Sequence, residues 1–113
     1  MSSEKETEKI IQELQIFEHN LHNLLLQKQA FQLELNETLN ASEEVKKTRD
    51  EIYKVADNFM IRADKEAVLK ELEEKEKVFK LRITTIEKQE RLLEVKIKEL
   101  QDEAKKILKP KKS

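Results

Sequence analysis

The sequence predicts a mainly α protein: a long antiparallel coiled-coil hairpin of two helices, joined by a short β-hairpin. Three observations support this prediction. Of the 113 residues, 42% are charged and 4% are aromatic, and glycine and cysteine are absent. Two stretches repeat apolar residues at alternating steps of three and four. A short segment rich in β-branched and aromatic residues separates them. We expect a single domain over residues 1–113.

The composition excludes several classes of protein. Phosphate-binding loops, dinucleotide-binding folds and nucleophile elbows need glycine, and disulfide frameworks and zinc ribbons need cysteine. We therefore expect no enzyme, no cofactor and no metal site. The 23 basic and 24 acidic residues nearly balance, so there is no general attraction to nucleic acid. No apolar run approaches the roughly 18 residues of a membrane span. The polar start MSSEKETEK argues against a secretory signal, so we expect a cytoplasmic protein.

The first helical arm is expected over about residues 5–47. Its apolar residues form a heptad seam, the row of a and d positions that faces a partner helix. The d positions are Ile10, Phe17, Leu24 and Phe31, the a positions are Leu14, Leu21, Lys28 and Leu35, and Thr38, Ser42 and Val45 continue the row. Ile11, Leu25 and Leu39 at e positions widen the apolar band enough to touch more than one partner.

The second arm is expected over residues 64–108. Its d positions are Leu72, Phe79, Ile86, Leu93, Leu100 and Ile107, and its a positions are Leu69, Glu76, Ile83, Glu90, Ile97 and Ala104. Glu76 and Glu90 would lie about 21 Å apart along a helix, too far to share a proton. We interpret these carboxylates, like Lys28, as residues that specify register or partner, or that loosen the seam.

The two seams are out of phase by one residue, so the chain is expected to break within Thr48–Asp64 and fold back. Periodicity alone leaves a single bent helix as the alternative. We expect residues 48–63 to form a β-hairpin, with strands Ile52-Tyr53-Lys54-Val55 and Phe59-Met60-Ile61-Arg62. The spacing of the apolar residues here also permits a continuing helix. Asp64 would be the N-cap of the second arm.

A two-stranded hairpin is marginally stable alone, and pairing with the hairpins of other chains would stabilise it. We therefore expect this segment to assemble with other subunits. The buried face would be either Tyr53, Val55, Phe59 and Ile61 or the alternate set Ile52, Ala56 and Met60. The candidate assembly residues are Ile52, Tyr53, Val55, Phe59, Met60 and Ile61. A local bend without assembly is the alternative.

The far ends of the arms carry more apolar side chains than one seam can use. They could hold many nonnative polypeptides without one specific pocket. The candidate client-binding residues are Ile10, Ile11, Leu14, Ile16, Phe17, Leu100, Ala104, Ile107 and Leu108. Ile11, Ile16 and Leu108 lie off the a and d series. Ordinary coiled-coil packing is the alternative for each of these residues.

The chain ends in a basic tail, residues 109–113, and five lysines follow Glu103 without an acid between them. These are Lys105, Lys106, Lys109, Lys111 and Lys112. They would favour an acidic partner surface in a salt-dependent way. A solubilising tail or weak contact with RNA is the alternative. His19 and His22, and the glycosylation-like Asn36 and Asn40, are interpreted as solvated helix-surface residues.

The central segment IYKVADNFMIRADKEAVLKELEEKE resembles, without a gap, the signature of the prefoldin β subunit, especially its archaeal form. The matching residues are Ile52-Tyr53-Lys54 at the start of the hairpin, Arg62, Lys65, and Glu71-Leu72 in the second arm. Both arms also look like those of the family, so the resemblance covers most of the chain. The turn glycine of the family is replaced by Asp57, which tolerates the left-handed conformation better than most residues.

The resemblance implies an ATP-independent chaperone, a holdase that binds unfolded polypeptides with its coiled-coil tips and transfers them to a group II chaperonin. It also implies a heterohexamer of two α-type and four β-type subunits, joined through β-barrels of hairpins. The acidic partner of the basic tail would then be the chaperonin that receives the client. Two rival interpretations are a structural or tethering coiled-coil protein that binds a dedicated folded partner and a small helical protein that contacts nucleic acid. Within the chaperone interpretation, a homohexamer of this chain is the alternative to the heterohexamer.

Overall fold

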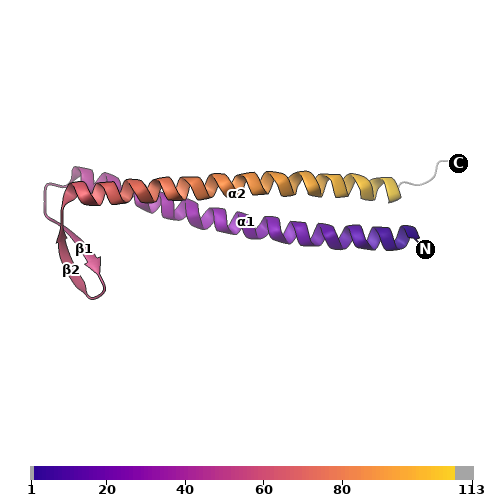
Figure 1. Cartoon of the computed structure of the whole chain (residues 1–113), viewed down its shortest axis with the longest axis horizontal. Coiled ribbons are helices and arrows are strands. Elements are labelled where there is room, and N and C mark those ends of the chain that lie inside the picture. Colours follow the sequence, from indigo (N-terminus) through magenta and orange to yellow (C-terminus); the bar gives the residue numbers. More distant parts are fainter. Residues whose placement is uncertain (1, 109–113) are drawn as a thin grey trace. The chain divides into compact units, whose positions relative to one another are not determined.

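The computed structural model describes residues 2–108 of the chain. Helix α1 spans Ser2–Lys47, strand β1 spans Ile52–Ala56, strand β2 spans Phe59–Ala63 and helix α2 spans Lys65–Leu108 (Figure 1). The helices therefore stop and restart at the limits of the predicted break, Thr48–Asp64. A β-hairpin fills this break, so the prediction of a hairpin is confirmed and the continuing helix is excluded.

The chain forms two compact units. The first unit contains the described parts of Met1–Lys28 and Thr85–Ser113, and the second unit is Gln29–Thr84, which includes the β-hairpin. In each unit a segment of α1 runs antiparallel to a segment of α2. The contacts that show this direction are Phe17 with Lys96 and Lys28 with Glu90 in the first unit, and Phe31 with Phe79 and Lys46 with Lys65 in the second. The predicted antiparallel pairing of the two arms is confirmed within each unit.

Burial in the described chain follows the predicted seams. Every a and d position named above in Ile10–Val45 and Leu69–Ile107 is buried or half-buried. The core is therefore a thin stripe between two helical segments rather than a thick interior. Because two helices cover only one stripe of each other, the e-position residues stay exposed; these are Ile11, Leu25 and Leu39.

Two charged seam residues meet in the first unit. Lys28 Nζ lies 2.8 Å from Glu90 Oε1, and Glu90 is buried. The hydrogen bond to Glu90 raises the pKa of Lys28 above its ordinary value, and desolvation opposes this rise. The sequence predicts a register-specifying role for both residues but does not pair them. Because a shifted alignment would leave a buried carboxylate without its cation, the pair favours one register. Glu76 instead contacts Lys80 of its own helix at 2.7 Å.

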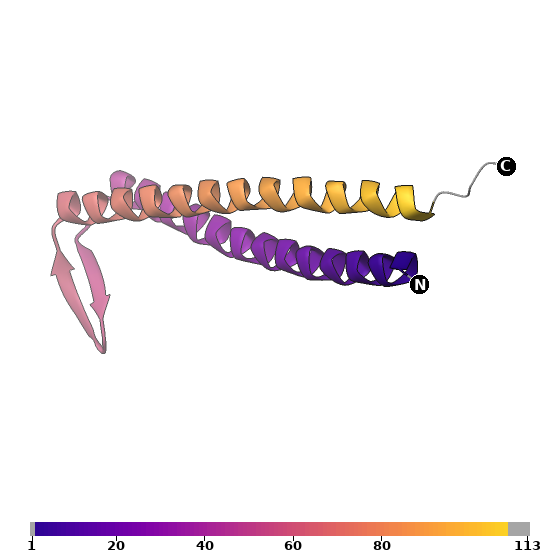
Figure 2. The ribbon, with the colours of Figure 1, turned by 45° about the vertical axis from the view of Figure 1, so that its right-hand side comes forward.

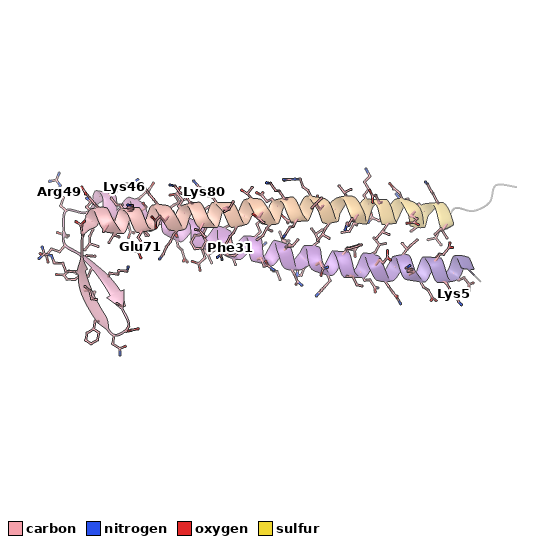
Figure 3. The ribbon with its side chains drawn as sticks, viewed as in Figure 1. Lys5, Phe31, Lys46, Arg49, Glu71 and Lys80 are labelled. Atoms are coloured by element: carbon pink, nitrogen blue, oxygen red, sulfur yellow. The ribbon has the colours of Figure 1, made fainter. Side chains whose placement is uncertain are left out.

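Aromatic rings occupy the seam of both units. In the second unit the ring centres of Phe31 and Phe79 lie 6.2 Å apart with a tilt of 34°, within the range of favourable aromatic pairs. The guanidinium carbon of Arg82 lies 5.3 Å from the centre of the Phe31 ring, which Figure 3 labels. In the first unit Lys96 Nζ lies 5.7 Å from the centre of Phe17. Long basic side chains thus cover seam rings while their charges stay in water.

Strands β1 and β2 pair antiparallel through the two-residue turn Asp57-Asn58. Asp57 has a φ of 54°, the left-handed conformation that costs a residue with a Cβ atom about 1–2 kcal/mol and glycine nothing. This is the position at which the resemblance leads us to expect glycine. The hairpin therefore closes in spite of the substitution, with aspartate, one of the residue types that tolerate this conformation best.

The strand register corrects the predicted faces of the hairpin. Directly opposed residues share a face, and the opposed pairs are Ile52 with Ala63, Tyr53 with Arg62, Lys54 with Ile61, Val55 with Met60 and Ala56 with Phe59. The expected placement of Phe59 and Ile61 on the Tyr53 face is therefore wrong. They lie on the opposite face, and Met60 takes the Tyr53 face. The turn length decides this, because a shift of one residue moves every side chain to the other face.

Asp64 begins α2 as the predicted N-cap. The backbone N–H of Ala67 donates to Asp64 Oδ2 at 3.4 Å, and the N–H of Val68 donates to the Asp64 carbonyl at 3.0 Å. These bonds satisfy donors that the first turn of a helix leaves without intrahelical partners. The local sequence therefore determines where the second helix starts.

Candidate functional site

The β-hairpin is the first candidate site. Within the described residues its sheet has two strands, so the outer edge of each strand carries backbone groups that no further strand pairs. The apolar hairpin surface consists of five exposed side chains, Tyr53, Val55, Phe59, Met60 and Ile61. Val55, Phe59 and Met60 are 70%, 71% and 71% exposed. Ile52, the sixth candidate assembly residue, is half-buried. Figure 2 shows the hairpin projecting from the helix ends of the second unit.

A carboxylate at the base of the hairpin links its two strands. The Tyr53 hydroxyl donates to Glu51 Oε2 at 2.7 Å, and Arg62 Nη2 lies 2.9 Å from Glu51 Oε1. The hydrogen bond to Glu51 raises the pKa of Tyr53 above its ordinary value. Because Tyr53 and Arg62 are directly opposed, one carboxylate holds both strands where they leave the helices. Glu51 cannot be recognised from the sequence, since a charged residue just before a strand adds no periodic signal.

An ion pair connects the hairpin to α2. Lys54 Nζ lies 2.8 Å from Glu71 Oε1 and 2.9 Å from Glu71 Oε2. The hydrogen bond from Lys54, followed by its charge, lowers the pKa of Glu71 below the ordinary value of 4.5. Figure 3 labels Glu71 on α2 beside the hairpin. Both residues belong to the signature segment, and their contact gives a physical reason for a lysine in the first strand and a glutamate early in the second arm.

Lys65 holds the other side of the hairpin base. Its Nζ donates to the carbonyl oxygens of Lys46 at 3.1 Å and Thr48 at 3.0 Å. The last carbonyls of a helix lack intrahelical donors and carry partial negative charge, so a lysine here stabilises the end of α1. The sequence marks Lys65 only through the family signature; its distance in sequence from Lys46 hides this role.

We expect the Lys54–Glu71 pair to orient the hairpin for assembly. Replacing Lys54 with glutamate should weaken subunit assembly about two- to fivefold, because an exposed ion pair contributes modestly and like charges repel. The reversed pair Lys54→Glu/Glu71→Lys should recover most of the loss. Since the folded-state pKa of Glu71 is lowered, the contribution is present above pH 4.5 and disappears as pH falls through the lowered pKa. Assembly constants from sedimentation over a series of pH values falling from 7 to below 4 test this; a reversed pair no better than the single variant would contradict it.

The candidate client-binding residues lie in the first unit and fall into two groups. The seam residues are buried or half-buried: Ile10, Leu14, Phe17, Leu100, Ala104 and Ile107. The exposed residues are Ile11, Ile16 and Leu108, and we call them the distal apolar residues. These three are the ones that the heptad pattern leaves off the a and d series. In the folded single chain they can contact another polypeptide without opening the seam.

The remaining candidate residues are the lysines at the chain end and the two histidines of α1. Lys105 and Lys106 are exposed in the last turn of α2, where cations interact favourably with the helix dipole. The other predicted tail lysines, Lys109, Lys111 and Lys112, lie outside the described residues. His19 and His22 are exposed, and His19 Nε2 lies 3.4 Å from Asn23 Nδ2. Among the described residues no group of three or more His, Asp or Glu could hold a metal ion.

Known proteins share both the sequence pattern and the fold of this chain. A family model described as Prefoldin subunit matches residues 4–111. The chain is 35% identical over 100 residues to the prefoldin subunit beta of Thermococcus onnurineus, spanning 87% of this chain and 86% of that protein. It is 38% identical over 90 residues to the prefoldin subunit beta of Pyrobaculum islandicum, spanning 78% and 72%. The crystal structure of the prefoldin beta subunit from Thermococcus strain KS-1 superimposes with a TM-score of 0.88 at 28% identity, covering 93% and 94%.

The chain belongs to the prefoldin family. Its similarity is to the β subunits, as the signature around the hairpin indicated. Prefoldin subunits are chaperones rather than enzymes, and a subunit of this family assembles with other prefoldin subunits. The exposed apolar hairpin surface is consistent with such assembly. Over residues 2–108, neither helix combines the length and apolar character that crossing a membrane requires.

Proposed function

We propose that this chain is a β-type subunit of an ATP-independent holdase that binds unfolded polypeptides and transfers them to a group II chaperonin. In this proposal two α-type and four β-type subunits form a heterohexamer in the cytoplasm. The observation that supports it best is the apolar hairpin surface, which the single chain leaves exposed on a sheet of two strands.

The hairpin would assemble by strand addition. Its unpaired edges offer backbone donors and acceptors to a neighbouring hairpin, and the side chains on both faces gain burial. Each large apolar side chain that becomes fully buried contributes about 1.5–3 kcal/mol. The Glu51 and Lys54 contacts hold the hairpin in place before assembly, which reduces the entropy lost on association.

Client binding would use the distal apolar residues Ile11, Ile16 and Leu108. They are dispersed over the helix ends of the first unit, so they can hold varied apolar sequences without one fixed pocket. No ATP would be needed, because release would follow from competition with the chaperonin. The candidate chaperonin-binding residues are the lysines of the chain end, of which Lys105 and Lys106 are exposed in the described chain. Their affinity for an acidic surface would fall with rising salt.

Removing the distal apolar residues tests the client-binding role. The test variant is Ile11→Ser/Ile16→Ser/Leu108→Ser, assembled with an α-type subunit. We expect it to lose more than about half of its ability to prevent aggregation of a denatured protein without ATP. The reason is that each substitution removes about 1.5–3 kcal/mol of apolar contact with the bound polypeptide. Light scattering during dilution of the client from denaturant measures this.

The matched control is Leu26→Ser/Leu33→Ser/Val78→Ser, which removes three exposed apolar residues away from the helix ends. It should retain full protection. If the unaltered assembly fails to suppress aggregation, the holdase proposal is wrong and a tethering role with a dedicated folded partner is favoured. Equal loss in both triple variants would show that client binding is not confined to the helix ends.

A further inference from the structure

The turn of the β-hairpin contains a residue type that its backbone conformation does not favour. Among the described residues Asp57 is the one with a positive φ, and Asn58 beside it does not share this conformation. A two-residue turn with a positive φ at its first residue alone belongs to the type that prefers glycine there, because a Cβ atom is crowded in this conformation. The closed turn is therefore less stable with Asp57 than it would be with glycine.

The base and the tip of the hairpin are held to different extents. At the base, Glu51 and Lys54 form the contacts described above. We call residues 55–60 the hairpin tip. In the described chain its side chains form no hydrogen bond or ion pair, and its three large apolar side chains are at least 70% exposed. The tip therefore gains little from side-chain burial, and a two-stranded hairpin with so little burial is marginally stable.

We infer that the hairpin tip is closed for only part of the time in the free subunit, and that Asp57 thereby limits the strength of subunit assembly. The inference rests on the proposed assembly through the hairpin. A tip that is partly open must close before it can pair with a neighbouring hairpin, so the apparent affinity falls with the closed fraction. A change that stabilises the closed turn raises this fraction and tightens assembly.

Three substitutions of Asp57 test the inference, with assembly with an α-type subunit measured by native mass spectrometry over a dilution series. Asp57→Gly should tighten assembly about threefold per subunit, because glycine adopts a positive φ without crowding but loses more freedom on closure. Asp57→Val should weaken assembly more than about fivefold, since β-branched residues tolerate a positive φ least. Asp57→Asn removes the charge but keeps a Cβ atom and a similar tolerance, so it should assemble like the unaltered chain.

Hydrogen exchange in the free subunit locates the effect. Asp57→Gly should slow exchange of the amides of the hairpin tip by the same factor of about three, because exchange reports the open fraction. The helix amides should be unchanged. The matched control is Asp50→Gly, the same substitution in the loop before β1, at an exposed residue without a positive φ. This control should neither tighten assembly nor slow exchange at the tip.

The combined results decide between strain at the turn and other causes. If Asp57→Gly leaves either assembly or tip exchange unchanged, the inference is wrong. An equal gain in Asp57→Asn or Asp50→Gly would assign the effect to the loss of a negative charge and would also overturn the inference. Failure of the unaltered chain to assemble with an α-type subunit would instead contradict the proposed function.

Discussion

Glutamate at both Val55 and Phe59 is expected to abolish subunit assembly while leaving the two helices folded. The two residues lie on opposite faces of the hairpin, and both are largely exposed in the single chain, so the chain itself loses little. In an assembly, at least one of them would be buried. Losing that apolar contact costs about 1.5–3 kcal/mol per subunit contact, and burying an unpaired carboxylate costs more. Association should weaken by more than about 100-fold, which native mass spectrometry with an α-type subunit measures.

The control for this variant is Val78→Glu/Leu92→Glu. Both residues are exposed apolar residues of α2 outside the hairpin, and the same charges there should leave assembly intact. Circular dichroism should show unchanged helix content for both double variants. Normal assembly of Val55→Glu/Phe59→Glu would mean that the apolar hairpin surface is not the assembly surface. Separate Val55→Glu and Phe59→Glu variants then identify which face is buried.

Replacing Ile86 with alanine is expected to lower the free energy of unfolding by about 2–3 kcal/mol. This is the lower end of the range of costs for truncating a buried isoleucine to alanine. Ile86 is 5% exposed in the seam of the first unit. The lower end applies because a thin seam can partly close around the space left behind. Few side chains are buried among the described residues, so this loss is a large part of the total stability. Urea unfolding at fixed protein concentration gives the value.

Leu92→Ala is the matched control for Ile86→Ala. Leu92 lies on the same helix and is 66% exposed, so truncating it should change stability by no more than about 0.5 kcal/mol. A cost close to that of Ile86→Ala would mean that the outer side of α2 is covered in solution. It would also show that the stability of the protein depends on contacts other than those between α1 and α2 in the single chain.

The local features of the fold follow from sequence because each depends on residues close together along the chain. Heptad spacing places Ile10 and Ile86 in the seam, since helical periodicity alone decides which side chains share a face. The one-residue change of phase locates the break, and Asp64 marks the start of α2 through its own cap. The off-series positions of Ile11, Ile16 and Leu108 likewise predict their exposure.

The contacts between distant segments required the tertiary structure. Lys28 and Glu90 are each recognisable as unusual seam residues, but their pairing depends on how the two arms align, which neither seam encodes by itself. The faces of the hairpin depended on a turn of two residues, and one residue more or less would exchange them. Lys65 reaches the end of α1 because the chain folds back. Periodicity determines the elements of this protein, whereas register and long-range electrostatics determine how they meet.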